Sequence, residues 1–286
     1  MTPRVSVVIP AYNNVQYIRE TLDSVVNQTY EDYEVVIADH SSIDGTAAII
    51  GRYASHPKVR VLSPTPAGGG AVANWNRVSQ NARGELIKLV CGDDLIAVDA
   101  LHLQVAAIDN NPSAVLASSK RNLIDSHGGV FIQGRGLQGI KGLVPGRQAV
   151  RATVRAGTNI FGEPACSLFR RDLLEKEGWW DNTNPYLIDE ATLSRLCLHG
   201  DVFAMHETLA SFRISASQWS VRLAKQQSEQ AIAFHHQLRT DDPELLSASD
   251  VAIGNLKAIG MAYARRLAYA KLRQRMGHQH AVESTT

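Results

Sequence analysis

The sequence predicts an α/β fold with a mostly parallel central sheet and helices on both of its faces. Short apolar segments alternate with segments of helical periodicity through the first half of the chain. The apolar segments lack the strict alternation of a half-exposed strand, which is typical of strands covered on both faces. Several of them end in acidic or polar residues, and open α/β sheets bind their ligands at the carboxyl ends of the strands.

The first two strand-helix units share one plan. Residues 5–14 give an apolar strand that ends near Pro10 and passes into a polar loop, and residues 17–28 have helical spacing. Residues 33–50 repeat this order, with Asp39 after the strand and Asp44 as the expected cap of the next helix. A third short strand over 59–64 and a glycine-rich loop with a helix over 66–84 continue the alternation.

The apolar run at residues 86–90 ends in Gly92-Asp93-Asp94. Two carboxylates at the end of a buried strand can hold a hard divalent cation, which in turn neutralises the phosphates of a substrate. A solvated turn that carries two charges is the alternative. A lone Gly-Asp-Asp does not distinguish a cation site from a solvated turn, so the surrounding motifs must distinguish them.

The second half of the chain is less regular. Strands are expected over 114–118 and 123–132, with a hairpin turn at 125–129, a mobile glycine-rich loop at 134–146 and a strand over 202–206. A helix is expected to begin at Asp189 and to end at Gly200. We expect a first domain over residues 1–217, a helical C-terminal extension over 218–277 and a disordered tail over 278–286.

Composition limits the classes of function. The formal net charge is +1 over 286 residues, which argues against a nucleic-acid partner. No apolar run approaches the length of a membrane span, and no signal peptide precedes Val5. Cys91, Cys166 and Cys197 are too few and too scattered for a disulfide framework or a zinc site, so we expect a cytoplasmic protein.

Four stretches together resemble the inverting family 2 glycosyltransferases, which have the GT-A fold. They are VSVVIPAYNN with the helix after it, EVVIADHSSIDGT, ARGELIKLVCGDD and YLIDEATLSRLCLHGD, in the order of the family. The resemblance implies transfer of a sugar from a UDP- or dTDP-sugar to a hydroxyl on a glycan, lipid-linked or small-molecule acceptor. It also implies Mn²⁺ or Mg²⁺ as cofactor and direct displacement at the anomeric carbon.

The resemblance implies a nucleotide site at the first two strand ends. Asp39 would accept the imide N–H of uracil or thymine, and Tyr12, two residues after Pro10, would pack on the base. The alternative for Asp39 is a helix cap or a turn. Arg77 is a further candidate for the diphosphate, because Trp75 stands where many members have an arginine.

The resemblance implies that Asp93 meets the metal ion, with Asp94 as its usual neighbour. Cys91 replaces the first aspartate of the motif, and a thiol cannot replace a carboxylate at Mg²⁺ or Mn²⁺. Ser215 likewise stands where many members have a histidine close to the metal. We therefore expect the metal to depend on Asp93, the donor phosphates and water, and to bind together with the nucleotide.

Asp189 matches the catalytic base of the family, which takes the proton of the acceptor hydroxyl. Ile188 replaces the first acid of the usual pair, and Glu190 is the neighbouring candidate. Glu163 would contact sugar hydroxyls or hold a turn. The pair Trp179 and Trp180 would form a stacking platform for a sugar, or one of the two would be core.

Two further questions concern partners. The basic amphipathic helix over 253–276 could touch a membrane peripherally or pack on its own domain or on a homodimer partner, and we favour packing on protein. A catalytically silent homologue that serves as a binding or scaffold partner is the alternative function. A nucleotidyltransferase is a third candidate function. The absence of a Gly-rich, Arg/Lys-bearing signature after the first strand argues against it.

Overall fold

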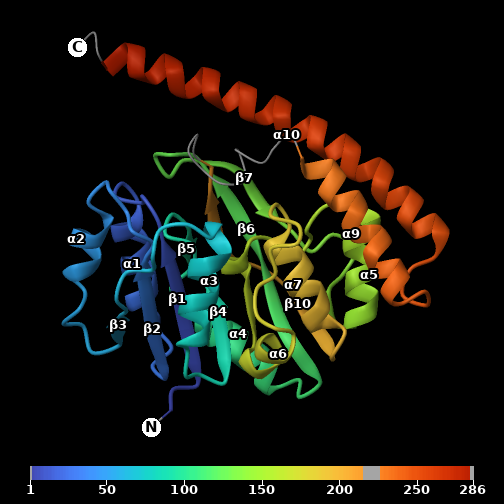
Figure 1. Ribbon diagram of the computed structural model, residues 1–286, viewed down its shortest axis with the longest axis horizontal. Helices are drawn as coiled ribbons and strands as arrows, with labels where there is room; N and C mark the ends of the chain where they lie inside the picture. The colour runs from blue at the N-terminus through green and yellow to red at the C-terminus, as the bar shows by residue number, and fades with distance from the viewer. Residues whose placement is uncertain (1, 215–225, 284–286) are drawn as a thin grey trace.

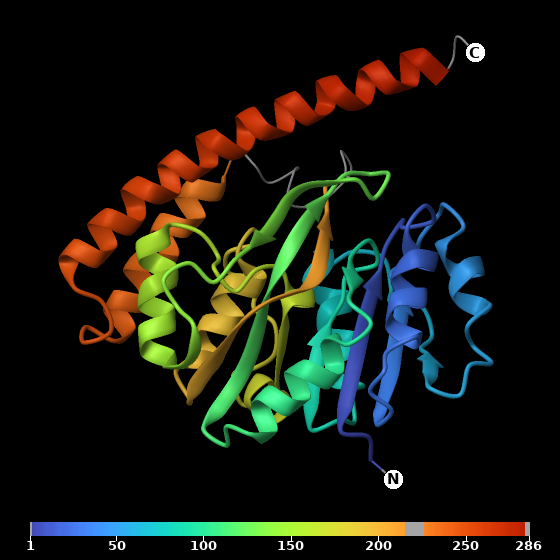
Figure 2. The same ribbon diagram turned by 180° about the vertical axis from the view of Figure 1, so that it is seen from behind.

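The computed structural model describes residues 2–214 and 226–283, with side chains described as far as Arg266. One twisted sheet forms the centre, and Figures 1 and 2 show helices on both of its faces. The strand order is β3-β2-β1-β4-β9-β6-β10-β5, with β7 paired to β6 and β8 to β10. The predicted α/β class with a mostly parallel sheet is confirmed. No helix in the described ranges is long and apolar enough to cross a bilayer.

The first half of the chain builds the parallel part of the sheet. Its strands are β1 (Val5–Ala11), β2 (Tyr33–Asp39), β3 (Val59–Val61) and β4 (Leu86–Leu89), and its helices are α1 (Ile18–Val26), α2 (Thr46–Gly51), α3 (Gly70–Gln80) and α4 (Ala100–Asp109). Ala11 is in register with Asp39, and Val8 with Leu89. Because these strands run in the same direction, the segments after β1, β2 and β4 meet at one edge.

The second half adds antiparallel pairs. Its strands are β5 (Leu95–Ile96), β6 (Ala114–Ile124), β7 (Val130–Arg135), β8 (Gly142–Pro145), β9 (Ser167–Arg170) and β10 (Asp201–Arg213). Strand β9 lies antiparallel between β4 and β6, and β10 lies parallel to β6. The helices are α5 (Gly146–Ala156), the short 3₁₀ turn η1 (Pro164–Cys166), α6 (Arg171–Lys176) and α7 (Ile188–Cys197).

Two sequence expectations for this half were partly wrong. The strands expected over 114–118 and 123–132 are one long strand, β6, followed by β7, because the polar residues between the apolar runs still pair with β10. The turn at 125–129 is confirmed, since Asp125 N donates to Gly129 O over 2.9 Å. The loop expected over 134–146 contains β8.

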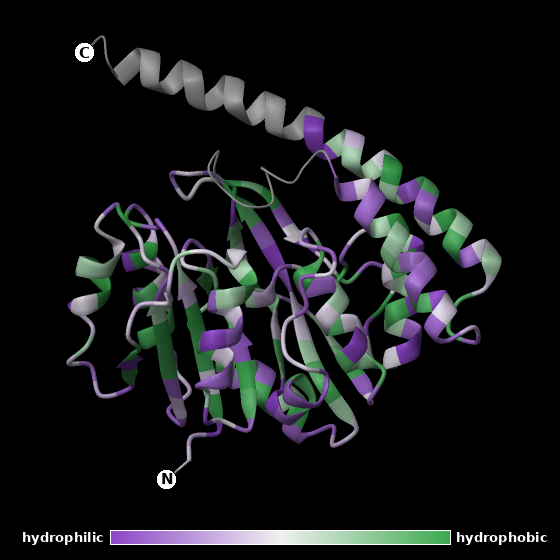
Figure 3. Ribbon diagram, viewed as in Figure 1, coloured by the Kyte–Doolittle hydropathy of each residue, from purple (hydrophilic) through white to green (hydrophobic). Residues whose placement is uncertain are grey.

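The apolar core lies in two layers, one on each face of the sheet. Helices α1 and α4 cover one face, and α3, α5 and α7 cover the other. Strand β1 is buried at every position, and β1 and β2 are mostly hydrophobic along their length (Figure 3). Lys88 is a charged residue within β4, a strand predicted from its apolar residues. Its side chain is fully buried, its Nζ donates to Gln104 Oε1 over 2.8 Å, and burial lowers its pKa to about 7.

The C-terminal extension consists of α9 (Gln227–Asp241) and α10 (Ala248–Glu283). Helix α10 packs on α9 and α5, and its far end projects beyond the body of the molecule (Figure 1). A Cβ on Gly254 would lie 2.4 Å from Val154 O, so the backbones of α10 and α5 are in close contact. The buried carboxylate of Asp250 accepts a hydrogen bond from Arg151 Nε over 2.9 Å and pairs with Arg155.

The boundaries of the extension stay predictions. Helix α10 reaches Glu283, within the tail expected over 278–286. The remaining three residues and the junction at 217–218 lie outside the described residues.

Candidate active site

The ends of β1 and β2 bring a buried carboxylate close to an exposed aromatic ring. Asp39 is 6% exposed, and its Oδ2 accepts a hydrogen bond from Ser42 N over 2.9 Å. Its Oδ1 is buried and has no hydrogen-bond partner within the described part of the chain. Tyr12 is 55% exposed, one residue beyond β1, and Pro10 pairs with Ala38 in the sheet. An unpaired buried acceptor next to an exposed ring suits a planar ligand that carries an N–H group.

Asp44 has the structural role expected from the sequence. Its Oδ1 accepts hydrogen bonds from Thr46 N over 2.9 Å and from Thr46 Oγ1 over 2.6 Å, at the first turn of α2. Its Oδ2 accepts one from Val15 N over 3.0 Å. These bonds tie the loop after β1 to the loop after β2, so the two loops next to Tyr12 and Asp39 are held together.

The turn after β4 is fixed from the far end of the chain. Arg213, the last residue of β10, is 1% exposed, and its Nε donates to Asp93 O over 3.1 Å. Its backbone N donates to Asp94 Oδ1 over 3.2 Å. The guanidinium also donates to Glu20 Oε2 over 2.7 Å and lies 4.5 Å from the centroid of the Tyr17 ring. Arg213 therefore fixes the shape of this turn.

Negative charge gathers around the Gly-Asp-Asp turn. Asp94 is 1% exposed, its Oδ2 finds no hydrogen-bond partner in the described ranges, and burial with the charges of Asp93 and Glu163 raises its pKa well above the usual range. Burial and four carboxylates, those of Asp94, Asp93, Asp189 and Glu163, raise the pKa of the Cys91 thiol. An excess of carboxylates at one edge favours binding of a cation.

Asp189 stands at the start of α7 on the other side of this edge. Its Oδ2 accepts a hydrogen bond from Asn159 Nδ2 over 3.0 Å, and its Oδ1 accepts one from Glu190 N over 2.8 Å. Burial and the charge of Glu163 raise the pKa of Asp189 to about 6. Burial and the charge of Asp189 raise the pKa of Glu190 to about 8. Asp189 is therefore the carboxylate of this pair that is ionised at neutral pH, and it is also the less buried one.

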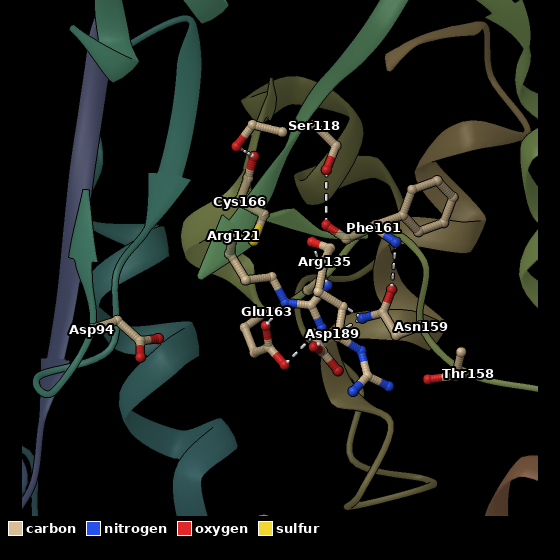
Figure 4. A network of polar contacts seen from close by, with 12 residues as sticks. Asp94, Ser118, Arg121, Arg135, Thr158, Asn159, Phe161, Glu163, Cys166 and Asp189 are labelled. Carbon is tan, nitrogen blue, oxygen red and sulfur yellow. Dashed lines mark hydrogen bonds and ion pairs between the residues drawn. The ribbon is translucent and has the colours of Figure 1, made fainter. Parts of the chain in front are cut away.

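Glu163 is held by a buried arginine. Arg121 Nε lies 2.5 Å from Glu163 Oε2, and Arg121 Nη2 donates to Glu163 Oε1 over 3.2 Å. Gly162 before it has a φ of 82°, and a Cβ there would lie 2.6 Å from Cys166 Sγ, so glycine is required. Figure 4 shows Asp94 on one side of the site and Glu163 and Asp189 on the other.

Two of the candidate groups have partners within the protein. Arg77 is in the last turn of α3, and its Nη2 donates to Ser63 O over 3.0 Å. Its role at the diphosphate stays a prediction. Trp180 is 2% exposed and donates from Nε1 to Ser79 Oγ over 2.9 Å, so it belongs to the core. Trp179 is partly exposed and has a left-handed φ of 71°.

Several residues of the site carry no signal in the sequence. Asn159 orients Asp189, Arg121 pairs with Glu163, and Arg265 of α10 bonds to Thr158, the neighbour of Asn159. Each comes from a different element, and none lies in a motif. Polar residues inside the otherwise apolar stretches 114–124 and 158–166 are the one local hint.

The residues at the edge fit a divalent cation only with help from a substrate. Within the described ranges, no group of three or more His, Cys, Asp or Glu side chains is arranged to hold a metal ion. Asp93 is partly exposed, and Asp94 Oδ2 is unpaired among the described groups, so carboxylate oxygens are available. Mg²⁺ commonly binds one or two carboxylates together with substrate phosphates. Ser215 lies outside the described residues.

Solved glycosyltransferases have the same fold. S. aureus TarS 1-349 in complex with UDP gives a TM-score of 0.66 at 19% identity, over 91% of this chain and 72% of that one. A mannosyltransferase from Pyrobaculum calidifontis in complex with GDP-Man and Mn²⁺ gives 0.65 at 20% identity, over 99% and 81%. The chain therefore has the GT-A fold. The model of glycosyl transferase family 2 matches residues 6–178, more than half of the chain, and the chain belongs to this family.

Curated relatives agree with this family. A chondroitin synthase from Escherichia coli is 35% identical over 133 residues, which are 46% of this chain and 19% of that protein. A poly(ribitol-phosphate) beta-glucosyltransferase from Bacillus spizizenii is 41% identical over 101 residues, which are 34% of this chain and 16% of that protein. The matches thus span less than a fifth of these two relatives. The predicted family and the predicted enzyme class are confirmed.

Proposed function

We propose that this glycosyltransferase moves a sugar from a UDP- or dTDP-sugar to a hydroxyl acceptor with inversion, and that Asp189 is the base. The observation that carries the proposal is the placement of Asp189. It is an oriented, partly exposed carboxylate across the site from the Gly92-Asp93-Asp94 turn, with a pKa raised by burial to about 6. A base near this pKa is largely ionised at neutral pH yet still basic enough to accept a proton.

The donor is proposed to bind at the ends of β1, β2 and β4. Asp39 Oδ1 would accept the imide N–H of the base, and the exposed ring of Tyr12 would pack on the base beside the strand end at Pro10. The two relatives with known structures support a nucleotide here, since one was solved with UDP and the other with GDP-Man. A uracil or thymine offers one imide N–H, which the unpaired Oδ1 of Asp39 can accept.

The diphosphate is proposed to lie over the Gly92-Asp93-Asp94 turn. Asp93 would hold Mg²⁺ or Mn²⁺, with the buried carboxyl of Asp94 behind it, whose raised pKa a bound cation would lower. When bound, the cation stabilises the negative charge that develops on the leaving diphosphate. Arg213 keeps the turn in place through Asp93 O, and Asn159 keeps the Asp189 carboxylate aimed at the acceptor hydroxyl. Cytoplasmic location remains a prediction from the three free cysteines.

Calorimetry tests the donor. We expect UDP or dTDP to bind far more tightly with Mg²⁺ or Mn²⁺ than without, and Asp39→Asn to weaken UDP because an amide donor would face the imide N–H. The exposed Asp32→Asn is the matched control and should bind UDP as the wild type does. Tighter binding of ATP than of UDP or dTDP would refute the donor assignment. Undiminished transfer in excess EDTA would remove the cation from the mechanism.

A further inference from the structure

Three arginines from separate elements meet beyond Asp189. Arg121 comes from β6, Arg135 from the end of β7 and Arg265 from α10. Arg121 Nη1 donates to Arg135 O over 3.2 Å, which joins the two strands at this point. Figure 4 shows Arg135 beside Asn159 and Asp189, on the side away from Asp94.

These arginines differ in how their charges are balanced. Arg121 is paired with Glu163. The guanidinium of Arg135 is half-buried and makes no hydrogen bond or ion pair with any described residue. Burial and the charges of Arg121 and Arg265 lower the pKa of Arg135, so its cation is held next to like charges. A half-buried guanidinium without an anion is costly unless a ligand supplies one.

Arg265 has neutral partners. Its Nη1 donates to Tyr186 OH over 2.7 Å and to Gln227 Oε1 over 3.4 Å, and its Nη2 donates to Thr158 Oγ1. The charge of Arg265 acts on Glu190, but burial and the charge of Asp189 still raise the pKa of Glu190 to about 8, so this carboxyl is mostly neutral at pH 7. The side of Asp189 that faces Arg135 and Arg265 thus carries an excess of positive charge, opposite to the acidic edge at Asp93 and Asp94.

The position of this positive charge indicates which substrate would bind next to it. An inverting base lies on the far side of the anomeric carbon from the leaving diphosphate, beside the acceptor hydroxyl. With the donor on the Asp39 and Asp93 side, the Arg135 side of Asp189 receives the acceptor. This step rests on the function proposed above.

We propose that Arg135 and Arg265 form an acceptor subsite for an oxyanion, a phosphate or a carboxylate carried by the acceptor next to the hydroxyl that receives the sugar. The planar fork of a guanidinium pairs with either group through two parallel hydrogen bonds. The Thr158 hydroxyl, already held by Arg265, stands beside this position. The acceptor class is then an anionic glycan or polyol phosphate, and its anion neutralises Arg135.

Ligand-observed NMR titration of the full chain tests the subsite with three small probes, namely glycerol 1-phosphate, glucuronate and glucose, each with and without UDP and Mg²⁺. We expect an anionic probe to bind more tightly than glucose. Arg135→Gln should weaken that anion about tenfold or more and leave UDP affinity unchanged, because a charge-assisted pair is lost on the acceptor side alone. Arg135→Lys keeps the charge without the fork and should lose less.

Arg266→Gln is the matched control. Its guanidinium lies over the Tyr263 ring of the same exposed turn, and anion binding should equal that of the wild type. The preferred probe, phosphate or carboxylate, assigns the source of the oxyanion. Equal binding of glucose and both anions, or an Arg135→Gln protein with unchanged anion affinity, overturns the proposal. Weaker UDP binding by Arg135→Gln also overturns it, because the arginine would then serve the donor. If UDP binds no variant while anions still depend on Arg135, the proposed function fails and the anion site stands.

Discussion

The side-chain amide of Asn159 holds the carboxylate of Asp189 through a hydrogen bond of 3.0 Å from Nδ2 to Oδ2. The same Nδ2 donates to Gly162 O over 2.8 Å, and Asn159 Oδ1 accepts from Phe161 N over 3.0 Å. Every polar atom of this amide is thus engaged, so the loop between α5 and η1 sets the direction of the carboxylate at the start of α7.

Removing the proposed base should separate chemistry from donor binding. Asp189→Asn preserves the shape of the side chain, and it should lower turnover by about 10²- to 10⁴-fold while UDP affinity stays the same. Steady-state kinetics and calorimetry on the same preparation measure both. Glu190→Gln is the neighbouring control and should retain most activity, since Glu190 is already largely protonated at pH 7. Loss of activity in Glu190→Gln with retention in Asp189→Asn would move the base by one residue.

The pH profile should report the charge of Glu163. Burial and Glu163 raise the pKa of Asp189 to about 6, and a base works only when deprotonated, so kcat/KM should fall as the pH drops through about 6. Glu163→Gln removes the nearby negative charge and should move this acid limb to lower pH. An acid limb that stays in place would show that another group titrates there.

Asn159→Ala should shift the pH profile of kcat/KM in the opposite direction from Glu163→Gln. The hydrogen bond from Asn159 favours the ionised form of Asp189, so its loss should move the acid limb of kcat/KM to higher pH and should also reduce kcat by misaligning the carboxylate. Asn159→Asp provides a second variant, because a carboxylate at this position would repel Asp189 and move the limb further. A shift of either variant to lower pH would contradict the role given to Asn159.

Lys88 should make stability depend on pH. Burial lowers its folded pKa from 10.5 to about 7, so between these values the unfolded chain binds one more proton and stability rises with pH. The expected slope is up to about 1.4 kcal/mol per pH unit, measured by urea unfolding between pH about 7 and 8.5, below the titration of the cysteines. Lys88→Met should remove this slope, whereas the exposed Lys176→Met should keep it. An unchanged slope in Lys88→Met would contradict the assignment.

Two glycines of α10 should respond oppositely to the same change. A Cβ on Gly254 would meet Val154 O at 2.4 Å, so Gly254→Ala should force α10 from α5 and destabilise the protein by about 1–3 kcal/mol. Gly260→Ala meets nothing within 4 Å and should stabilise the helix by about 0.5–1 kcal/mol. Chemical denaturation measures both. Stabilisation by Gly254→Ala would mean that α10 does not dock on α5 as described.

The sequence predicts best what depends on neighbouring residues. Three features could be read from local patterns, and the structure places them as expected. They are the apolar strand that ends at Asp39, the apolar strand that precedes the turn with Asp93, and the helix that begins beside Asp189. Local patterns also assigned Asp44 to the helix start, because an aspartate before a helix bonds its first N–H groups.

What the sequence leaves open depends on long-range packing. The insertion of β9 between β4 and β6 brings Glu163 to Arg121, and nothing within either segment specifies that pairing. The burial of Lys88 follows from Gln104 on α4, a residue whose place opposite the strand is set only by the fold. From the sequence, Trp180 fits a platform that stacks on a sugar as well as it fits the core. In the structure its ring N–H donates to Ser79 of α3 within the core.

The contact between Arg213 and Asp93 spans 120 positions of the sequence. A ribosome that has completed the first hundred residues has already made Tyr12 and Asp39, the residues of the proposed base site, and the Gly92-Asp93-Asp94 turn. It has not yet made the side chain that holds the carbonyl of that turn or the backbone N–H that holds Asp94. The growing chain should therefore acquire an ordered turn only after β10 has entered the sheet, late in synthesis, and any nascent fragment that ends before Arg213 should lack it.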